Sequence, residues 1–165
     1  MVKNNISKEI FRFILIALII ATLIFIFSNS LKSKEVSSLD SQKVGGIVSL
    51  IFPPDTPIGA FIAENIRKIA HFLEFGLLGF FTALYVSFYT RRRLLFGLMS
   101  LSFGLFAGLV DESLQYISLR GPSIIDVWID FGGFSAFALA TYLLLTLIAF
   151  LVYRGEIKRE EKNNG

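Results

Sequence analysis

Ionisable side chains gather near the start of one long apolar segment, where they could bind a polar ligand or move a proton. The segment carries Glu64, Arg67, His71 and Glu74. At 100° per residue these positions fall within about 80° of one another on a helix, so they share a face. A histidine beside carboxylates serves as a hydrogen-bond bridge or as a general acid or base. An arginine on the same face offers a contact for an anionic group.

Two further polar groups follow later in the chain, around the ends of apolar segments. The first comprises Asp111, Glu112 and Gln115, and the second comprises Arg120, Asp126 and Asp130. Helical geometry places Asp111 and Gln115 on one stripe with Gly104 and Gly108. Two small residues at this spacing let another helix approach closely. Helices that pack through this stripe therefore bring the polar groups together, and we predict one shared polar pocket.

The composition identifies the environment of these residues. Of the 165 residues, 54% are hydrophobic and only 18% are charged, and phenylalanine alone contributes 18 residues. A soluble domain of this length buries only about 70% of its unfolded surface, so it could not hide this much apolar side chain. The composition excludes a disordered chain, a nucleic-acid-binding domain and most soluble enzymes. It indicates a small integral membrane protein.

Four apolar runs are long enough to cross a bilayer, which takes about 20 predominantly apolar residues. We predict spans at about residues 10–27, 66–89, 94–110 and 127–152. The first run exceeds the apolar region of a signal peptide, which is about 7–15 residues long, and no small-residue cleavage site follows it. The predicted fold is an all-α bundle of four transmembrane helices, with one domain at 1–153 and a charged cytoplasmic tail at 154–165.

The basic residues predict how the bundle is oriented. Ten of the 16 flank the first span, the junction of the second and third spans, and the end of the fourth. They are Lys3, Lys8, Arg12, Arg91, Arg92, Arg93, Arg154, Lys158, Arg159 and Lys162. The positive-inside rule then places both termini in the cytoplasm of a multi-pass protein of the bacterial cell membrane. The polar groups would face outward.

The first outer loop contains a pattern typical of a short interfacial helix. Apolar residues occur at i, i+3, i+4 and i+7, namely Val44, Ile47, Val48 and Ile51. We expect Ser37 or Ser38 to cap this helix, which would lie on the outer leaflet. Thr56 followed by Pro57 resembles a cap with proline at the first helical position, so the second long helix is expected to begin before the membrane.

Residue counts limit the cofactor chemistry. The chain has no cysteine and one histidine, which excludes disulfides, iron–sulfur clusters, thiolate zinc sites and multi-histidine metal sites. No cofactor or metal site is predicted. One alternative stays open if the protein is an enzyme: hard oxygen ligands for a divalent cation. The carboxylates in question are Asp111, Glu112, Asp126 and Asp130.

Each polar group also has a purely structural interpretation. Ser123 and Asp126 have the spacing of a capping box. Arg67 could form an ion pair with Glu64 or Glu74 that makes their entry into the membrane tolerable. Structural ion pairs, however, need not gather on one side of the membrane on three different helices.

The order of these motifs resembles the VanZ-like membrane family over about residues 27–140. The resemblance rests on Arg67-x3-His71-x2-Glu74, on Asp111-Glu112-x2-Gln115, on Arg120 and Asp126, and on FSNS at residues 27–30. Asp130 departs from the expected pattern, in which we would expect asparagine; the extra negative charge could alter ligand preference. The resemblance implies a cell-envelope role, associated in this family with low-level resistance to teicoplanin.

Two functions follow as hypotheses. In the first, Arg67 and Arg120 contact the headgroup of a membrane lipid, a lipid-linked cell-wall precursor or a lipoglycopeptide, and the other ligand-binding candidates line the pocket. Those candidates are His71, Glu74, Asp111, Glu112, Gln115 and Asp126. In the alternative, an intramembrane enzyme acts on a phosphate- or ester-linked headgroup. Glu74 or Asp111 would then be the base and His71 its acid–base partner.

Overall fold

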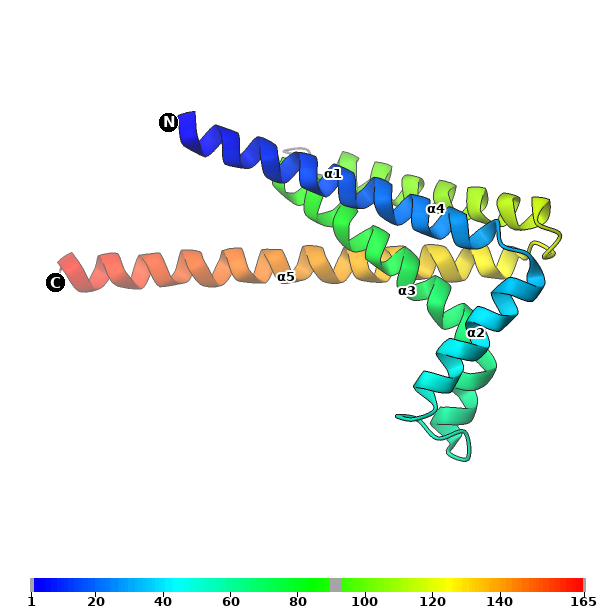
Figure 1. Cartoon of the computed structure of the whole chain (residues 1–165). Coiled ribbons are helices and arrows are strands. Elements are labelled where there is room, and N and C mark those ends of the chain that lie inside the picture. The colour runs from blue at the N-terminus through cyan, green and yellow to red at the C-terminus, as the bar shows by residue number, and fades with distance from the viewer. Residues whose placement is uncertain (1, 90–92, 165) are drawn as a thin grey trace.

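The computed structural model describes residues 2–89 and 93–164, which form helices joined by short turns (Figure 1). The helices are α1 (Val2–Ser30), α2 (Lys34–Val48), α3 (Pro57–Tyr89), α4 (Arg93–Ile117) and α5 (Ile124–Asn164). Four segments are long and apolar enough to span a membrane: Ile6–Ser30, Pro57–Phe88, Gly97–Ile117 and Ile124–Glu156. The predicted all-helical class and its four spans are confirmed, and each segment extends beyond the predicted bounds at one end or both.

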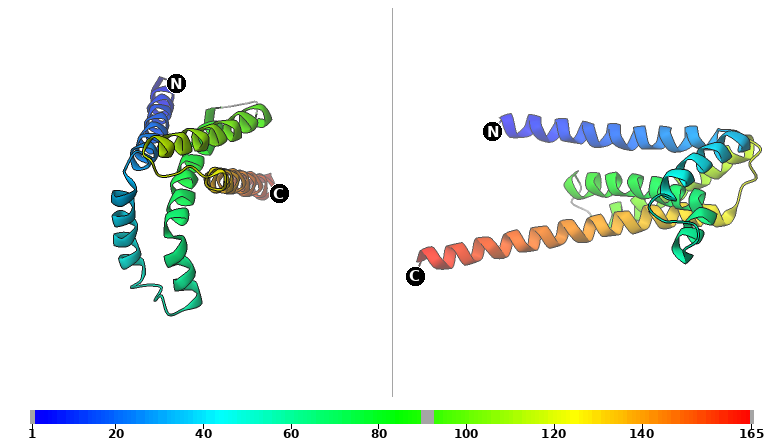
Figure 2. Two further views of the ribbon diagram at one scale, coloured as in Figure 1. Left: turned by 90° about the vertical axis from the view of Figure 1, so that its right-hand side faces the viewer. Right: turned by 60° about the horizontal axis from the view of Figure 1, so that its bottom comes forward.

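The start of α1 and the end of α5 lie on the same side of the bundle, as an even number of spans requires (Figures 1 and 2). The opposite side, which we call the polar end, is formed by the end of α1, the end of α4 and the start of α5. Arg91 and Arg92, two of the residues in the predicted topology signal, lie outside the described residues.

The apolar core is small and lies where the four long helices meet. It consists of buried side chains from every long helix: Ile26, Phe75, Leu78, Ala107 and Phe134. Many other large apolar side chains point outward, such as Phe13 and Phe106. Exposed apolar side chains suit contact with lipid tails, and helices in lipid are held together mainly by close packing.

Close packing is most evident where α3 crosses α5. A Cβ atom added at Gly133 would overlap the backbone carbonyl of Phe72, and one at Gly79 would overlap the carbonyl of Phe134. On α4, a Cβ at Gly104 would overlap the ring of Phe134, while Gly108 faces Asp130. The Gly104–Gly108 stripe therefore packs against α5, as its spacing predicts, and sets the approach of the residues that follow it.

Helix α2 and the first part of α3 form a hairpin that projects from the bundle (Figure 2). Ser33 caps α2, accepting a hydrogen bond from the Val36 N–H. The predicted cap at Ser37 or Ser38 is thus wrong, because the helix begins a full turn earlier. Ile51 lies in the turn beyond the end of α2. The interfacial placement of α2 stays a prediction.

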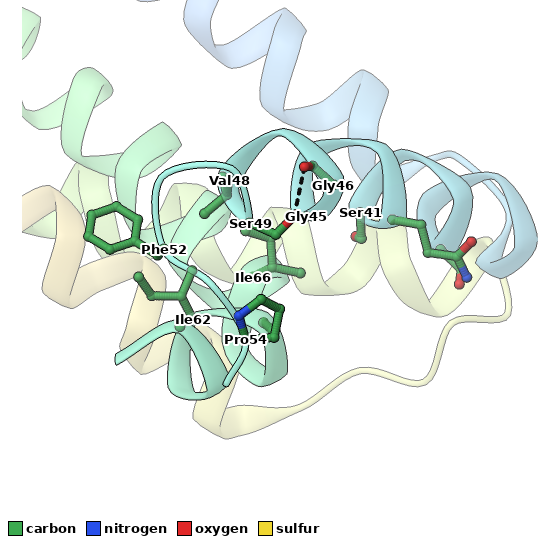
Figure 3. A pocket seen from close by; sticks show the side chains of 13 residues that line it. Ser41, Gly45, Gly46, Val48, Ser49, Phe52, Pro54, Ile62 and Ile66 are labelled. Atoms are coloured by element: carbon green, nitrogen blue, oxygen red, sulfur yellow. Dashed lines mark hydrogen bonds between the residues drawn. The ribbon is translucent and has the colours of Figure 1, made fainter. Parts of the chain in front are cut away.

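Polar contacts fix both ends of this hairpin. The Lys32 ammonium donates to Asp40 Oδ2 at 2.8 Å, and this hydrogen bond holds the pKa of the Asp40 carboxyl below its usual range. Thr56 Oγ1 accepts from the Gly59 N–H at 3.0 Å, which confirms the predicted cap before Pro57. Between α2 and α3 lies an open groove of about 390 Å³, lined by residues such as Gly45, Val48, Phe52, Ile62 and Ile66 (Figure 3).

Helix α4 ends in a turn that holds a leucine in the left-handed backbone region. The Arg120 N–H donates to the Gln115 carbonyl and the Leu119 N–H to that of Tyr116, at 3.0 and 3.2 Å. This is the Schellman motif, which favours glycine at the left-handed position. Here Leu119 occupies that position with φ of 58° and is 90% exposed.

Replacing Leu119 with glycine is therefore expected to stabilise the protein by about 0.5–1 kcal/mol, because glycine adopts positive φ without steric cost. The measurement is the temperature at which half of the detergent-solubilised protein remains monodisperse on size exclusion, with an expected rise of about 1–4 °C. Gly121→Ala is the matched opposite change, since Gly121 has φ of 77°. A lower transition temperature for Leu119→Gly would contradict the expectation.

Candidate functional site

Gln115 is the centre of a buried hydrogen-bond network at the polar end. Its Nε2 donates to Asp111 Oδ2 at 2.9 Å and to Glu112 Oε1 at 2.7 Å, and its Oε1 accepts from Arg67 Nη2 at 2.5 Å. The side chain is fully buried. One amide thus holds two carboxylates of α4 in fixed orientations and ties them to α3.

Asp111 connects this network to the end of α1. Its Oδ1 accepts a hydrogen bond from Ser30 Oγ at 2.6 Å, and both side chains are buried. The hydroxyl of Ser118 donates in turn to the Ser30 carbonyl at 2.9 Å. Ser30, the last residue of the FSNS segment, is therefore a member of the site, a role that no spacing pattern in the sequence indicates.

His71 faces two carboxylates from two other helices. Its Nδ1 lies 3.3 Å from Asp130 Oδ1 on α5 and 3.7 Å from Asp111 Oδ2 on α4. Asp130 is fully buried, and its Oδ2 has no hydrogen-bond partner among the described residues. Asp130 thus lies at the heart of the site. The sequence predicts Asp130 as part of the shared polar pocket and as a possible oxygen ligand for a cation, but not as one of the residues that bind the headgroup.

Glu112 closes the site on the side of the following turn. Its Oε2 accepts from the Ser123 N–H at 2.6 Å, just before α5 begins. In a capping box this N–H would bond to the Asp126 carboxylate. Asp126 therefore does not complete the reciprocal box. Its negative charge in the first turn still suits the positive end of the helix dipole.

Two arginines lie near one another at the edge of the network. Arg120 Nη1 donates to the Asn29 carbonyl at 2.9 Å, while Arg120 Nε is buried without a partner among the described residues. Burial lowers the pKa of the Arg120 guanidinium, and the positive charge of Arg67 lowers it further. We call Arg67 and Arg120 the arginine pair. The Asn29 side chain donates to Glu74 Oε1 at 3.3 Å, which places Glu74 beside the same segment.

The predicted site residues converge with few exceptions. We call the connected set the polar cluster: Ser30, Arg67, His71, Asp111, Glu112, Gln115 and Asp130. Glu74 and Arg120 join it through Asn29, and Asp126 is half-buried beside Glu112 and Arg120. Glu64 is exposed and takes no part in the site, so three of the four residues predicted on this face of α3 remain in it, namely Arg67, His71 and Glu74. Arg67 bonds to Gln115, and the described residues show no ion pair of Arg67 with Glu64 or Glu74.

A match to a protein-family model agrees with this arrangement. The model of the VanZ/LLP1 family matches residues 13–152, which is most of the chain. The chain belongs to the VanZ/LLP1 family. The match includes every residue of the polar cluster and parts of all four spans. No curated protein and no solved structure matches the chain. Membership in the VanZ/LLP1 family, together with the four apolar helices, identifies a multi-pass membrane protein.

The site of this VanZ/LLP1 family member has two chemically different halves. The arginine pair offers guanidinium groups, which suit phosphate and carboxylate anions. His71 with Asp111 and Asp130 offers ring nitrogen and carboxylate oxygens, which suit proton transfer or a cation. Helices α3, α4 and α5, together with the turn that carries Arg120, supply both halves, so the packing of the bundle determines their spacing.

Proposed function

We propose that the arginine pair binds the phosphate-bearing headgroup of a membrane lipid or lipid-linked cell-wall precursor. The observation that carries the proposal is the pairing of two like charges, with one buried guanidinium nitrogen, Arg120 Nε, left without a partner. Two neighbouring guanidinium groups repel each other, and the carboxylates of Asp111, Glu112 and Asp126 offset only part of the cost of holding Arg120 charged. A phosphate supplies the charge and the acceptor oxygens that both groups require.

A lipid-borne phosphate is favoured by the apolar surface beside the site. An open groove of about 380 Å³ runs between the end of α4 and the start of α5, lined by Leu109, Glu112, Tyr116, Pro122, Ile124 and Val127. Tyr116 and Ile124 are among the most exposed large side chains of this end. A lipid could lay an acyl chain along this groove while its headgroup reaches the arginine pair.

Replacing Arg67 or Arg120 with glutamine is expected to weaken lipid binding about tenfold or more, since a hydrogen bond to a charged group contributes about 1.5–3 kcal/mol. Native mass spectrometry of the detergent-solubilised protein with phosphatidylglycerol measures this, and diacylglycerol serves as the lipid without phosphate. Lys68→Gln is the matched control, because Lys68 is exposed next to Arg67 on α3. Equal binding of both lipids, or unchanged binding by both arginine variants, would contradict the proposal.

An intramembrane enzyme is the second candidate, favoured by the contact of His71 with two carboxylates next to the arginine pair. His71 would exchange a proton with the headgroup or with water, and Glu74 or Asp111 would act as the base. The arginine pair would stabilise the negative charge that develops on the phosphate. The same spectra distinguish the two candidates, since a bound lipid would be recovered intact and a substrate would be recovered cleaved.

We also propose that the polar end faces outward, with both termini in the cytoplasm, as the basic residues predict. Headgroup binding on that face would change how a lipoglycopeptide such as teicoplanin meets the cell surface. Expression in a susceptible Gram-positive host should then raise the inhibitory concentration of teicoplanin. Unchanged susceptibility with correctly inserted protein would contradict the resistance part of the proposal and leave headgroup binding to its own test.

A further inference from the structure

Three side chains from three helices bring metal-ligating atoms together within the polar cluster. His71 of α3, Asp111 of α4 and Asp130 of α5 each offer one ligand atom, and these atoms lie within 4.8 Å of one another. We propose that these three residues bind a divalent transition-metal ion, with Zn²⁺ the best fit. A nitrogen and two carboxylate oxygens form a mixed donor set, which suits zinc.

The distances agree with those of a tetrahedral ion. Zinc bonds of about 2.0–2.1 Å place neighbouring ligand atoms about 3.3–3.4 Å apart. His71 Nδ1 lies 3.3 Å from Asp130 Oδ1 and 3.7 Å from Asp111 Oδ2. A shift of Asp111 Oδ2 by a few tenths of an ångström would bring its distance from His71 Nδ1 to that of a tetrahedral zinc site.

A second observation comes from Asp130 itself. Its side chain is fully buried, and Oδ2 has no hydrogen-bond partner among the described residues. A buried carboxylate oxygen without a partner is costly, and a metal ion is one of the groups that satisfies it. Because the other oxygen of Asp130 already faces His71, an ion between the two residues could also engage Oδ2.

The charges around the three residues favour a cation. Asp111 and Asp130 are both fully buried. The charge of Arg120 acts on Asp111, but the hydrogen bonds of the arginine pair go to Gln115 and to the Asn29 carbonyl. A protonated His71 would neutralise only one of the two carboxylates. A divalent ion would neutralise both, and it would leave His71 neutral to act as a ligand.

The surrounding hydrogen bonds resemble the outer shell of a metal site. Ser30 donates to one oxygen of Asp111 and Gln115 to the other, and Gln115 is itself held by Arg67. Partners of this kind orient metal ligands. Three protein ligands leave a fourth zinc position open to water or to a headgroup oxygen. The inference goes beyond headgroup binding and does not depend on it.

Metal content provides the test. Protein purified without a histidine tag is stripped with a chelator, incubated with Zn²⁺, desalted and analysed by mass spectrometry of the elements. We expect one zinc per chain, and Asp130→Asn should weaken zinc binding at least tenfold while it preserves side-chain volume. Asp55→Asn, at an exposed position in the turn before α3, is the matched control and should retain zinc. His71 is the only histidine and cysteine is absent, so few other strong zinc sites compete.

Two further measurements make the result decisive. His71→Gln should lose zinc as Asp130→Asn does, and size exclusion establishes that each variant is folded. Cobalt loading of the wild type should give visible absorption bands of a tetrahedral site, which the two variants lack. No retained zinc in the wild type, or equal retention in Asp130→Asn, would overturn the proposal. The assay contains no lipid and leaves the arginine pair unchanged, so its failure is distinct from failure of headgroup binding.

Discussion

Replacing Gly133 with alanine should force α3 and α5 apart and destabilise the bundle. A Cβ atom at this position would overlap the backbone carbonyl of Phe72, which cannot rotate away as a side chain could. The helices α3 and α5 must therefore separate. Overpacking of this kind costs about 3 kcal/mol, which for a chain of this length lowers the transition temperature by about 6–12 °C.

The measurement is the temperature at which half of the detergent-solubilised protein stays monodisperse on size exclusion. Gly97→Ala is the matched control, because a Cβ at Gly97 meets nothing within 4 Å. Alanine at that helical position should leave the protein as stable or stabilise it by up to about 1 kcal/mol. A Gly133→Ala protein that melts with the wild type would show that α3 and α5 do not touch there.

The second large effect is expected for Gln115→Leu. The change keeps the side-chain volume but removes the amide that serves Arg67, Asp111 and Glu112 at once. Each buried group left without a partner costs about 1–3 kcal/mol, and charged groups cost more. We therefore expect a total loss of at least about 3 kcal/mol, because Asp111 and Glu112 are both buried.

The same thermal assay tests this expectation. Gln42→Leu on α2 serves as the control, because Gln42 is exposed and the described structure gives its side chain no hydrogen bond. Its transition temperature should change little. If Gln115→Leu were as stable as the control, the amide would not be the centre of the network.

The helical fold and part of the polar site can be predicted from the sequence, because the length of a helix and the face on which each side chain lies depend on neighbouring residues. Hydropathy identified the four spans, and the 3.6-residue repeat placed Asp111 and Gln115 on the stripe with Gly108. The structure retains that stripe, which packs on α5. The cap at Thr56 was predicted for the same reason, since it depends only on neighbouring residues.

Contacts between helices depend on where the helices cross, and this the sequence pattern alone does not specify. The glycine contacts of α5 with α3 and α4 bring Asp130 to His71, so its central position became visible only in the structure. Glu64 shares the helical face of Arg67, yet it is exposed, and its neighbours Ala63 and Ile66 line the groove between α2 and α3. A helical wheel gives the angular position of each side chain around the helix axis, but it does not give the position along the axis at which another helix crosses.

The small polar residues at the end of α1 could not be assigned to the site from the sequence either. Ser30 and Asn29 follow an apolar run, where short polar side chains commonly end a span, and no spacing rule connected them to Asp111 or Glu74. Their roles depend on α1 lying against α3 and α4. Ser33, Ser37 and Ser38 all lie near the start of α2, and Ser33 is the cap because α2 begins directly after the turn that follows α1.

The contact of Gly133 with Phe72 also limits how far the polar cluster can widen. His71 directly precedes Phe72, and Asp130 lies three residues before Gly133, so a contact between two backbones fixes the spacing of these side chains. Flexible side chains could yield to a larger ligand, but two touching backbones cannot. On the headgroup proposal, the contact between α3 and α5 would limit the size of the ligand, and the turn that carries Arg120 would select for its charge.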